Sequence, residues 1–199
     1  PMRLRKRQRG SLRFKARLVV AAASALFLVA GIAIVYLNLG TSQESRAAVA
    51  GDYRTLISGN WNAIGTWEKY DGTAWLPAVT TPNSADGTIT IQNTHSVNVT
   101  ANVSVDQVVV ETGATLNIST GTFAVVNGTG NDFDISGTAN QITGGNLTIA
   151  AGALVNVSNG GSYIYNGGTR TLTGWAVNNG GAYVHNVNNI NLPTATWGA

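Results

Sequence analysis

Apolar and polar residues alternate in short runs along most of the chain after residue 87. In Ser96-Val-Asn-Val-Thr100, for example, every second side chain is apolar. This is the period of a β-strand with one buried face, and Gly or Asn closes the runs as a turn would. The pattern therefore predicts an all-β fold of many short strands. The predicted strands are residues 88–91, 96–100, 103–110, 115–119, 122–126, 146–150, 154–158, 163–165 and 183–185.

Two pairs of segments resemble each other at related spacings. Gly113–Ser119 resembles Gly152–Ser158, and Gly160–Tyr165 resembles Gly180–His185 at close to half the spacing of the first pair. A degenerate period of about 20 residues, which fits both pairs, is typical of a solenoid. We therefore predict a parallel β-helix, in which each turn of chain forms two or three strands and the next turn stacks on it at about 4.8 Å.

An antiparallel β-sandwich is the alternative architecture. Asn-Gly pairs favour the tight turns of β-hairpins. Such pairs occur at residues 127–128, 159–160 and 166–167. The degenerate repeat of the segments favours the parallel β-helix over the sandwich.

Residues 51–87 differ in composition from the strands that follow. Trp61, Trp67 and Trp75 lie in this segment, together with Tyr70. The end of a solenoid exposes an apolar core and unpaired strand edges, so it needs a covering segment. One interpretation is an aromatic N-terminal cap. The other is a ligand-binding platform, in which the faces of Trp61, Trp67, Trp75 and Tyr70 stack on sugar rings.

Residues 1–50 have the pattern of an export signal. An uncharged run from Leu18 to Leu37 follows a basic segment, which is the order of a signal peptide. The run is long enough to span a bilayer, whereas Ala48-Val-Ala50 fits signal-peptidase cleavage. The leader is thus either a cleaved signal peptide or an anchor, and residues from 51 onward lie outside because the positive end stays cytoplasmic. The basic residues before the run are Arg3, Arg5, Lys6, Arg7, Arg9, Arg13, Lys15 and Arg17.

Charge separates the leader from the rest of the chain. The whole chain has a formal net charge of +3, but residues 51–199 hold three basic and eight acidic residues, a net charge of −5. This balance argues against nucleic acid as a partner. The chain has no cysteine, so no disulfide framework supports the fold. We expect an extracellular or cell-surface protein whose partners are glycans or neighbouring cells. The leader is expected to bind the export machinery, and it stays in the membrane if it is an uncleaved anchor.

Candidate catalytic and metal-binding residues are few. Strand alternation would place the carboxylates of Asp132 and Asp134 on one face, where they could bind Ca²⁺ or act as a carboxylate pair. The other interpretation is a solvated turn beside glycine. His95 and His185 are isolated and cysteine is absent, which argues against a zinc site. We assign no catalytic residue and no cofactor other than this calcium candidate.

A set of motifs between residues 56 and 120 resembles known families. The segments are Ser58-Gly-Asn-Trp61, Gly65-Thr-Trp67, Trp75, Pro77, Asp86-Gly-Thr-Ile-Thr-Ile91, His95-Ser-Val-Asn-Val99 and Val108–Leu116. They resemble the opening of secreted and cell-surface repeat proteins that Gram-negative bacteria export by the type IX route. They are also similar to the eight-glycine domain of extracellular polysaccharide-processing and receptor proteins. The resemblance implies a right-handed β-helix at the cell surface, in families associated with adhesion or with binding and cutting polysaccharides.

Two functional hypotheses follow. The first is a non-enzymatic structural or adhesion module that binds glycans, and the second is the N-terminal part of a carbohydrate-active β-helix enzyme, a polysaccharide lyase or hydrolase. The scarcity of charged clusters favours the first. The predicted organisation is a leader at 1–50, an aromatic cap at 51–87 and coils at 88–199, with further coils expected beyond Ala199.

Overall fold

The computed structural model of this protein describes residues 47–188 and 191–198. Nearly all of the predicted leader lies outside the described residues. In the described part the regular secondary structure consists of β-strands and one short 3-10 helix, η1 (Ile64–Thr66), and no helix there is long and apolar enough to cross a membrane. Residues 48–199 form one compact unit by themselves.

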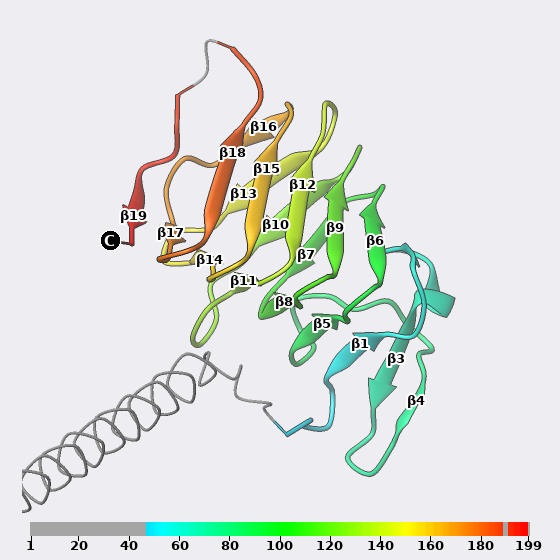
Figure 1. Ribbon diagram of the computed structural model, residues 1–199. Helices are drawn as coiled ribbons and strands as arrows, with labels where there is room; N and C mark the ends of the chain where they lie inside the picture. Colours follow the sequence, from blue (N-terminus) through cyan, green and yellow to red (C-terminus); the bar gives the residue numbers. More distant parts are fainter. Residues whose placement is uncertain (1–46, 189–190, 199) are drawn as a thin grey trace, which may run out of the picture. The chain divides into compact units, whose positions relative to one another are not determined.

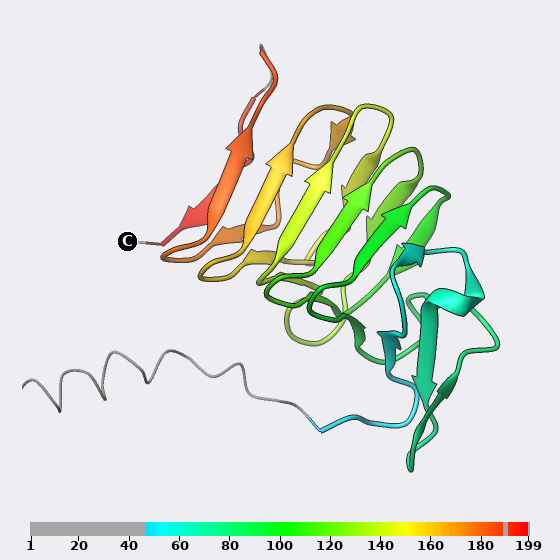
Figure 2. The same cartoon turned by 45° about the vertical axis from the view of Figure 1, so that its right-hand side comes forward.

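Strands from successive turns of the chain stack in parallel and build three sheets along one axis (Figure 1). A full turn contributes one strand to each sheet, so strands that are consecutive in sequence lie in different sheets (Figure 2). This arrangement is a parallel β-solenoid and confirms the predicted fold class. The sandwich alternative is wrong, because the strands on either side of each Asn-Gly pair belong to different sheets and do not form a hairpin.

The three sheets differ in the number of strands. The parallel strands of sheet A are β1 (Tyr53–Thr55), β5 (Ile89–Ile91), β8 (Val108–Val110), β11 (Phe133–Ile135), β14 (Val155–Val157), β17 (Trp175–Val177) and β19 (Ala195–Trp197). Sheet B contains β2 (Gly59–Asn60), β6 (Ser96–Val99), β9 (Thr115–Ile118), β12 (Thr138–Gln141), β15 (Ser162–Tyr165) and β18 (Ala182–His185). Sheet C contains β7 (Val103–Val105), β10 (Thr122–Val125), β13 (Asn146–Ile149) and β16 (Thr169–Arg170).

The register of stacking explains one of the two sequence repeats. Tyr163 of β15 lies beside Tyr183 of β18, so the repeat with the shorter spacing marks successive turns. The repeat with the longer spacing does not, because its first copy carries β9 of sheet B and its second carries β14 of sheet A. These two segments share a glycine turn followed by in-out alternation, and that local pattern is common to all three sheets.

The length of a turn varies because the corners between strands vary. Ile89 pairs with Val108 and Val108 pairs with Phe133, so these turns differ by several residues while the strand register stays intact. The predicted strand at 103–110 is two strands, β7 and β8. Gln107 in the corner between them has a φ of 53°, the left-handed region that ends a strand.

Alternate side chains of every sheet point into one continuous core. In β6 and β9, for instance, Val97 and Leu116 are buried and stack in register. The core also contains aromatic contacts across sheets, such as Phe123 with Phe133, whose ring centroids are 5.2 Å apart. Since each turn packs only on its neighbours, apolar burial along the axis supplies the stability that disulfides would otherwise give.

The N-terminal segment extends sheet A in a different way. β1 pairs in parallel with β5 and antiparallel with β3 (Trp67–Tyr70), and β3 pairs antiparallel with β4 (Trp75–Pro77). Sheet A therefore ends in a three-stranded antiparallel part, β1-β3-β4. This part carries most of the aromatic residues singled out in the sequence.

Candidate functional site

Trp61 and Trp67 lie in the core, with exposed fractions of 2% and 0%. The indole Nε1 of Trp61 donates to the carbonyl of Pro82 (3.0 Å), and that of Trp67 donates to the carbonyl of Trp61 (2.8 Å). Their rings meet edge to face at 4.9 Å, and Trp61 also contacts Phe123 at 5.4 Å. A sugar has no open ring face to stack on here, so these two tryptophans are removed from the predicted platform.

Tyr70 and Trp75 remain at the surface, and the register of β3 and β4 brings them together. They are directly opposite each other across the antiparallel pair, and both are partly exposed. Their ring centroids are 5.2 Å apart with an interplanar angle of 46°. The two residues predicted as separate candidates thus form one contiguous aromatic surface.

Arg54 and Glu68 lie on the same face as this aromatic pair. Glu68 is two residues from Tyr70 on β3, and Arg54 is opposite Glu68 on β1, so alternation directs all three side chains to one side. Arg54 Nε donates to Glu68 Oε1 in an ion pair. The guanidinium also lies over the Trp75 ring, with Cζ 4.2 Å from its centroid. We call Arg54, Glu68, Tyr70 and Trp75 the aromatic face.

The chemistry of the aromatic face suits a neutral polyhydroxylated ligand. Tyr and Trp rings offer apolar surface for the C–H side of a sugar ring, while the free N–H groups of Arg54 and the carboxylate of Glu68 supply donors and acceptors at its edge. Arg54 and Glu68 largely neutralise each other. The cation–π contact, worth about 0.5–1 kcal/mol at an exposed site, restrains the Trp75 ring.

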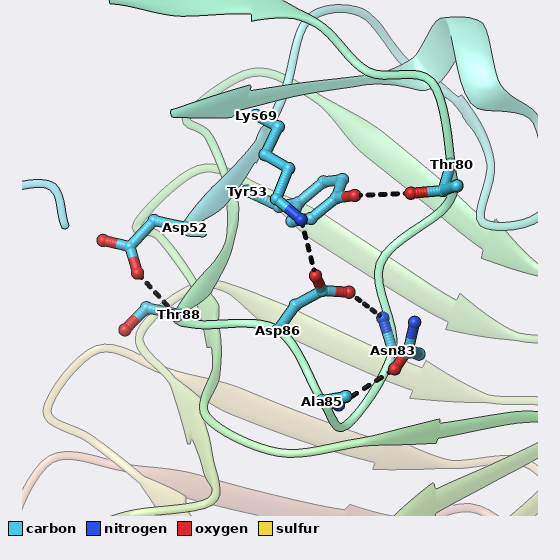
Figure 3. A network of polar contacts seen from close by, with 8 residues as sticks. All are labelled: Asp52, Tyr53, Lys69, Thr80, Asn83, Ala85, Asp86 and Thr88. Atoms are coloured by element: carbon cyan, nitrogen blue, oxygen red, sulfur yellow. Dashed lines mark hydrogen bonds and ion pairs between the residues drawn. The ribbon is translucent and has the colours of Figure 1, made fainter. Parts of the chain in front are cut away.

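A polar network on the opposite side of β1 and β3 fixes the position of these strands (Figure 3). Lys69 Nζ donates to Asp86 Oδ1 (2.9 Å) and lies 4.8 Å from the centroid of the Tyr53 ring. The Tyr53 hydroxyl shares a hydrogen bond of 2.8 Å with the Thr80 hydroxyl. The hydrogen bond that Lys69 donates to Asp86 is the main cause of its raised pKa, so the Lys69 ammonium stays charged.

The same network attaches the loop between β4 and β5 to the start of sheet A. The second oxygen of Asp86 accepts from the backbone N–H of Asn83 (3.0 Å). Asp52 Oδ1 accepts from the N–H of Thr88 (2.8 Å), and its Oδ2 accepts from the N–H of Val49 (2.8 Å). Carboxylates held by backbone donors in this way order loops. This network therefore holds β1 and β3, two of the strands that carry the aromatic face, in place.

Asp132 and Asp134 do not share a face. Asp132 precedes β11 at a corner and is fully buried; its oxygens accept from the N–H groups of Gly128 (2.6 Å) and Leu154 (2.8 Å). Asp134 lies on the outward side of β11 and accepts from Asn131 and Asn156 side chains. The same-face expectation is wrong because strand alternation begins only at Phe133. In the described part of the chain, no three His, Cys, Asp or Glu residues are grouped to hold a metal ion.

Asp106 is the acidic residue that the structure places near Asp132. It lies in the corner between β7 and β8, and its carboxylate packs against Gly128 so closely that an added Cβ there would come within 2.1 Å of Oδ2. Desolvation, a hydrogen bond with Asp132 and the charge of Asp132 raise the pKa of Asp106. The two residues belong to different turns, so a local sequence pattern gives no sign that they meet.

The histidines have separate environments. His95 Nδ1 shares a hydrogen bond of 2.7 Å with the hydroxyl of Thr55. His185 is on β18, where it contacts the Tyr165 and Tyr183 rings at 5.3 and 6.2 Å. Neither histidine is placed beside an acidic residue or a second histidine by these contacts.

Comparison with protein-family models, with curated proteins and with solved structures finds no match to this chain. Function is therefore inferred from the residues and their geometry.

Proposed function

We propose that this protein is an exported structural and adhesion module that works at the cell surface or after secretion. The basic and apolar leader, the cysteine-free composition and the net charge of −5 over residues 51–199 support export of the solenoid. A stack of short turns suits a stalk, because its length grows by repetition and each turn packs only on its neighbours. The proposal includes the right-handed winding of the families that residues 56–120 resemble.

Residues 51–87 are proposed to cap the N-terminal end of the stack. β1 and β2 pair with β5 and β6, the first strands of sheets A and B in the coils. Trp61 packs on Phe123, which belongs to β10 of sheet C. Such a segment protects the apolar core and the strand edges from solvent.

The aromatic face is the proposed glycan-contact site. The observation that carries this proposal is the partly exposed Tyr70–Trp75 pair. Arg54 and Glu68 lie beside it on the antiparallel part of sheet A, which the polar network holds in place. The core tryptophans Trp61 and Trp67 use their indole N–H groups in internal hydrogen bonds. A ring that is partly exposed and restrained, as Trp75 is, loses little entropy when a sugar stacks on it.

The test is glycan binding by full-length protein and two matched variants. Trp75→Ala removes the stacking ring, and Leu76→Ala is the control, because Leu76 is the next residue of β4, points to the opposite face and is 49% exposed. We expect Trp75→Ala to weaken retention on a glycan array about tenfold, equivalent to roughly 1.4 kcal/mol. Leu76→Ala should bind like the wild type.

The thermal unfolding midpoint separates binding from folding. Equal retention by wild type and Trp75→Ala, with unchanged midpoints, would refute the glycan-contact site. If the thermal unfolding midpoint of Trp75→Ala is lower than that of the wild type, Tyr70→Leu provides the second measurement. This variant removes the other aromatic ring and keeps an apolar side chain. Surface proteolysis of intact cells tests export independently, and protection of the solenoid from added protease would contradict it.

A carbohydrate-active enzyme is the second candidate, and one observation favours it. The pKa of Asp106 is raised, and this residue lies beside the buried carboxyl group of Asp132. Two neighbouring carboxyl groups in different environments are an arrangement used for acid–base catalysis. Depolymerisation of polysaccharides by the full-length protein, abolished in Asp106→Asn, would establish the enzyme. An unchanged polysaccharide chain length would exclude this activity for the substrates tested.

A further inference from the structure

Asn127 and Gly128 form one of four Asn-Gly pairs in the chain, and the others are at residues 159–160, 166–167 and 179–180. In such a pair the glycine nitrogen can attack the side-chain Cγ of the asparagine and close a succinimide ring, because glycine has no side chain to hinder the approach. The attack is slow, since an amide nitrogen is a weak nucleophile until a base takes its proton. A base held at one glycine N–H would therefore select one pair among the four.

Asp132 places a carboxyl oxygen at the N–H of Gly128. Its Oδ1 accepts from this N–H at 2.6 Å, within the range of about 2.6–3.2 Å that joins a nucleophile to its base. Its Oδ2 accepts from the N–H of Leu154 at 2.8 Å, and the residue is fully buried, so both oxygens are held in position. Among the described residues, Gly128 is the only glycine of the four pairs whose N–H donates to a side-chain carboxyl group.

The packing of the loop between β10 and β11 keeps a glycine at position 128. A Cβ added there would lie 2.1 Å from Asp106 Oδ2 and 2.4 Å from its Oδ1. On the other side of Gly128, the Nε2 of Gln107 donates to the carbonyl of Thr129 at 2.8 Å. These contacts hold the Asn127–Gly128 bond in one place relative to Asp132.

The side-chain amide of Asn127 is open to attack. Asn127 is exposed, and within the described part of the chain its amide makes no hydrogen bond. It lies against Gly152 of the next turn, where an added Cβ would be 2.9 Å from Asn127 Nδ2. No bond therefore has to break before the Cγ is attacked, and water has access to the loop.

Two other Asn-Gly pairs in the same fold lack this arrangement. The N–H of Gly160, which follows Asn159, donates to the carbonyl of Gly180 at 2.9 Å, and a carbonyl oxygen is too weak a base to take the proton. The amide of Asn166 is bonded to asparagines of the preceding and following turns at 2.7 and 2.8 Å, so attack on its Cγ would break both bonds. These pairs are internal controls for Asn127.

We propose that Asn127 is a self-modification site, at which Asp132 acts as the base that converts Asn127 to aspartate and isoaspartate. Asp132 Oδ1 takes the proton of the Gly128 N–H, and the nitrogen forms a bond to Asn127 Cγ. The bond from Cγ to Nδ2 breaks, and Nδ2 leaves as ammonia with the proton that Gly128 gave up. Water then opens the succinimide at either carbonyl, so the loop gains a carboxylate and no oxidant or cofactor is consumed.

The first test follows the loss of each asparagine in the full-length wild-type protein. Peptide mass spectrometry after incubation in buffer gives the rate at Asn127, Asn159 and Asn166. A positioned general base contributes about 100-fold or more, so we expect Asn127 to react at least about tenfold faster than Asn159. In urea the carboxyl group is no longer held at Gly128, and the three rates should converge. An equal ratio of the Asn127 and Asn159 rates in folded and unfolded protein would overturn the proposal.

Two variants test the role of Asp132. Asp132→Asn keeps the size of the side chain and removes the base, so the rate at Asn127 should fall at least about tenfold while that at Asn159 stays the same. Asp134→Asn is the matched control, because Asp134 accepts from Asn131 and Asn156 on the outward side of β11, and it should keep the preference for Asn127. An unchanged rate at Asn127 in folded Asp132→Asn would refute the assignment of the base. If the thermal midpoint shows that this variant does not fold, the comparison of folded and unfolded wild type decides.

Discussion

We predict that the side chain of Gln141 contributes strongly to stability, because its fully buried amide joins two turns of the solenoid. Its Nε2 donates to the carbonyls of Gly145 (2.9 Å) and Thr169 (2.7 Å), and its Oε1 accepts from the Tyr163 hydroxyl. Gly145 belongs to the same turn, whereas Tyr163 and Thr169 belong to the next one. Burial raises the pKa of Tyr163, so its hydroxyl remains a donor.

Replacing this amide removes the partner of three polar groups, of which the Gly145 carbonyl and the Tyr163 hydroxyl are in buried hydrogen bonds and the Thr169 carbonyl is in a part-buried one. In Gln141→Leu each of the two buried groups costs about 1–3 kcal/mol, and the added apolar burial offsets part of the sum. We expect a loss of about 2–5 kcal/mol in the free energy of unfolding, a large share of the roughly 5–15 kcal/mol of a typical domain. Tyr163→Phe orphans only Gln141 Oε1, so its expected cost is about 1–3 kcal/mol.

Equilibrium unfolding in urea, followed by tryptophan fluorescence, measures both values. Trp175 is a suitable reporter because its ring lies 4.7 Å from that of Tyr163. Gln92→Leu is the control: its amide donates one part-buried hydrogen bond of 3.2 Å to the Thr55 carbonyl, so the loss of this one bond should cost about 1 kcal/mol. A cost of Gln141→Leu no greater than that of the control would refute the reasoning.

Two further predictions concern pH and close packing. The pKa of Asp106 is raised in the folded state above its ordinary value of 3.8, so the folded state binds the Asp106 proton more tightly than the unfolded state does. The free energy of unfolding of the wild type should therefore rise as the pH falls from about 7 to about 4, and it should rise more than that of Asp106→Asn. Parallel pH profiles of the denaturant midpoints of the two proteins would contradict this. Gly137→Ala should cost at least about 3 kcal/mol or prevent folding, because its Cβ would lie 2.2 Å from the Glu111 carbonyl oxygen and 2.5 Å from that of Ala114. Gly65→Ala, with nothing within 4 Å of the new Cβ, should leave the thermal midpoint nearly unchanged.

Alternation predicted most strands because one face of each strand is buried. Three of the missed strands were overlooked for identifiable reasons. The buried face of β12 includes the polar side chain of Gln141, so this strand does not show an apolar face in the sequence. β17 (Trp175–Val177) has apolar residues on both faces, so its residues do not alternate. β11 does alternate, but the neighbouring Asp132 made it resemble a solvated turn.

The candidate site was predictable only in part. Composition identified the aromatic residues of 51–87, but an indole in a core and an indole at a surface look alike in sequence. The pairing of Tyr70 with Trp75 depends on the register of β3 and β4, and the approach of Asp106 to Asp132 depends on how two turns stack. Long-range register is information that a local pattern does not contain.

The stacking of turns also has a mechanical consequence. Strands within the coils bond to the turns before and after them, and no cysteine is present to tie distant turns together. A pull on the C-terminal end would load one turn at a time, and the turn at the end would detach before the next is strained. Each event would release a turn of about 20 residues, or roughly 70 Å of extended chain. The stalk proposed above would therefore yield in steps under tension, and each step would dissipate work while the remaining turns stayed folded.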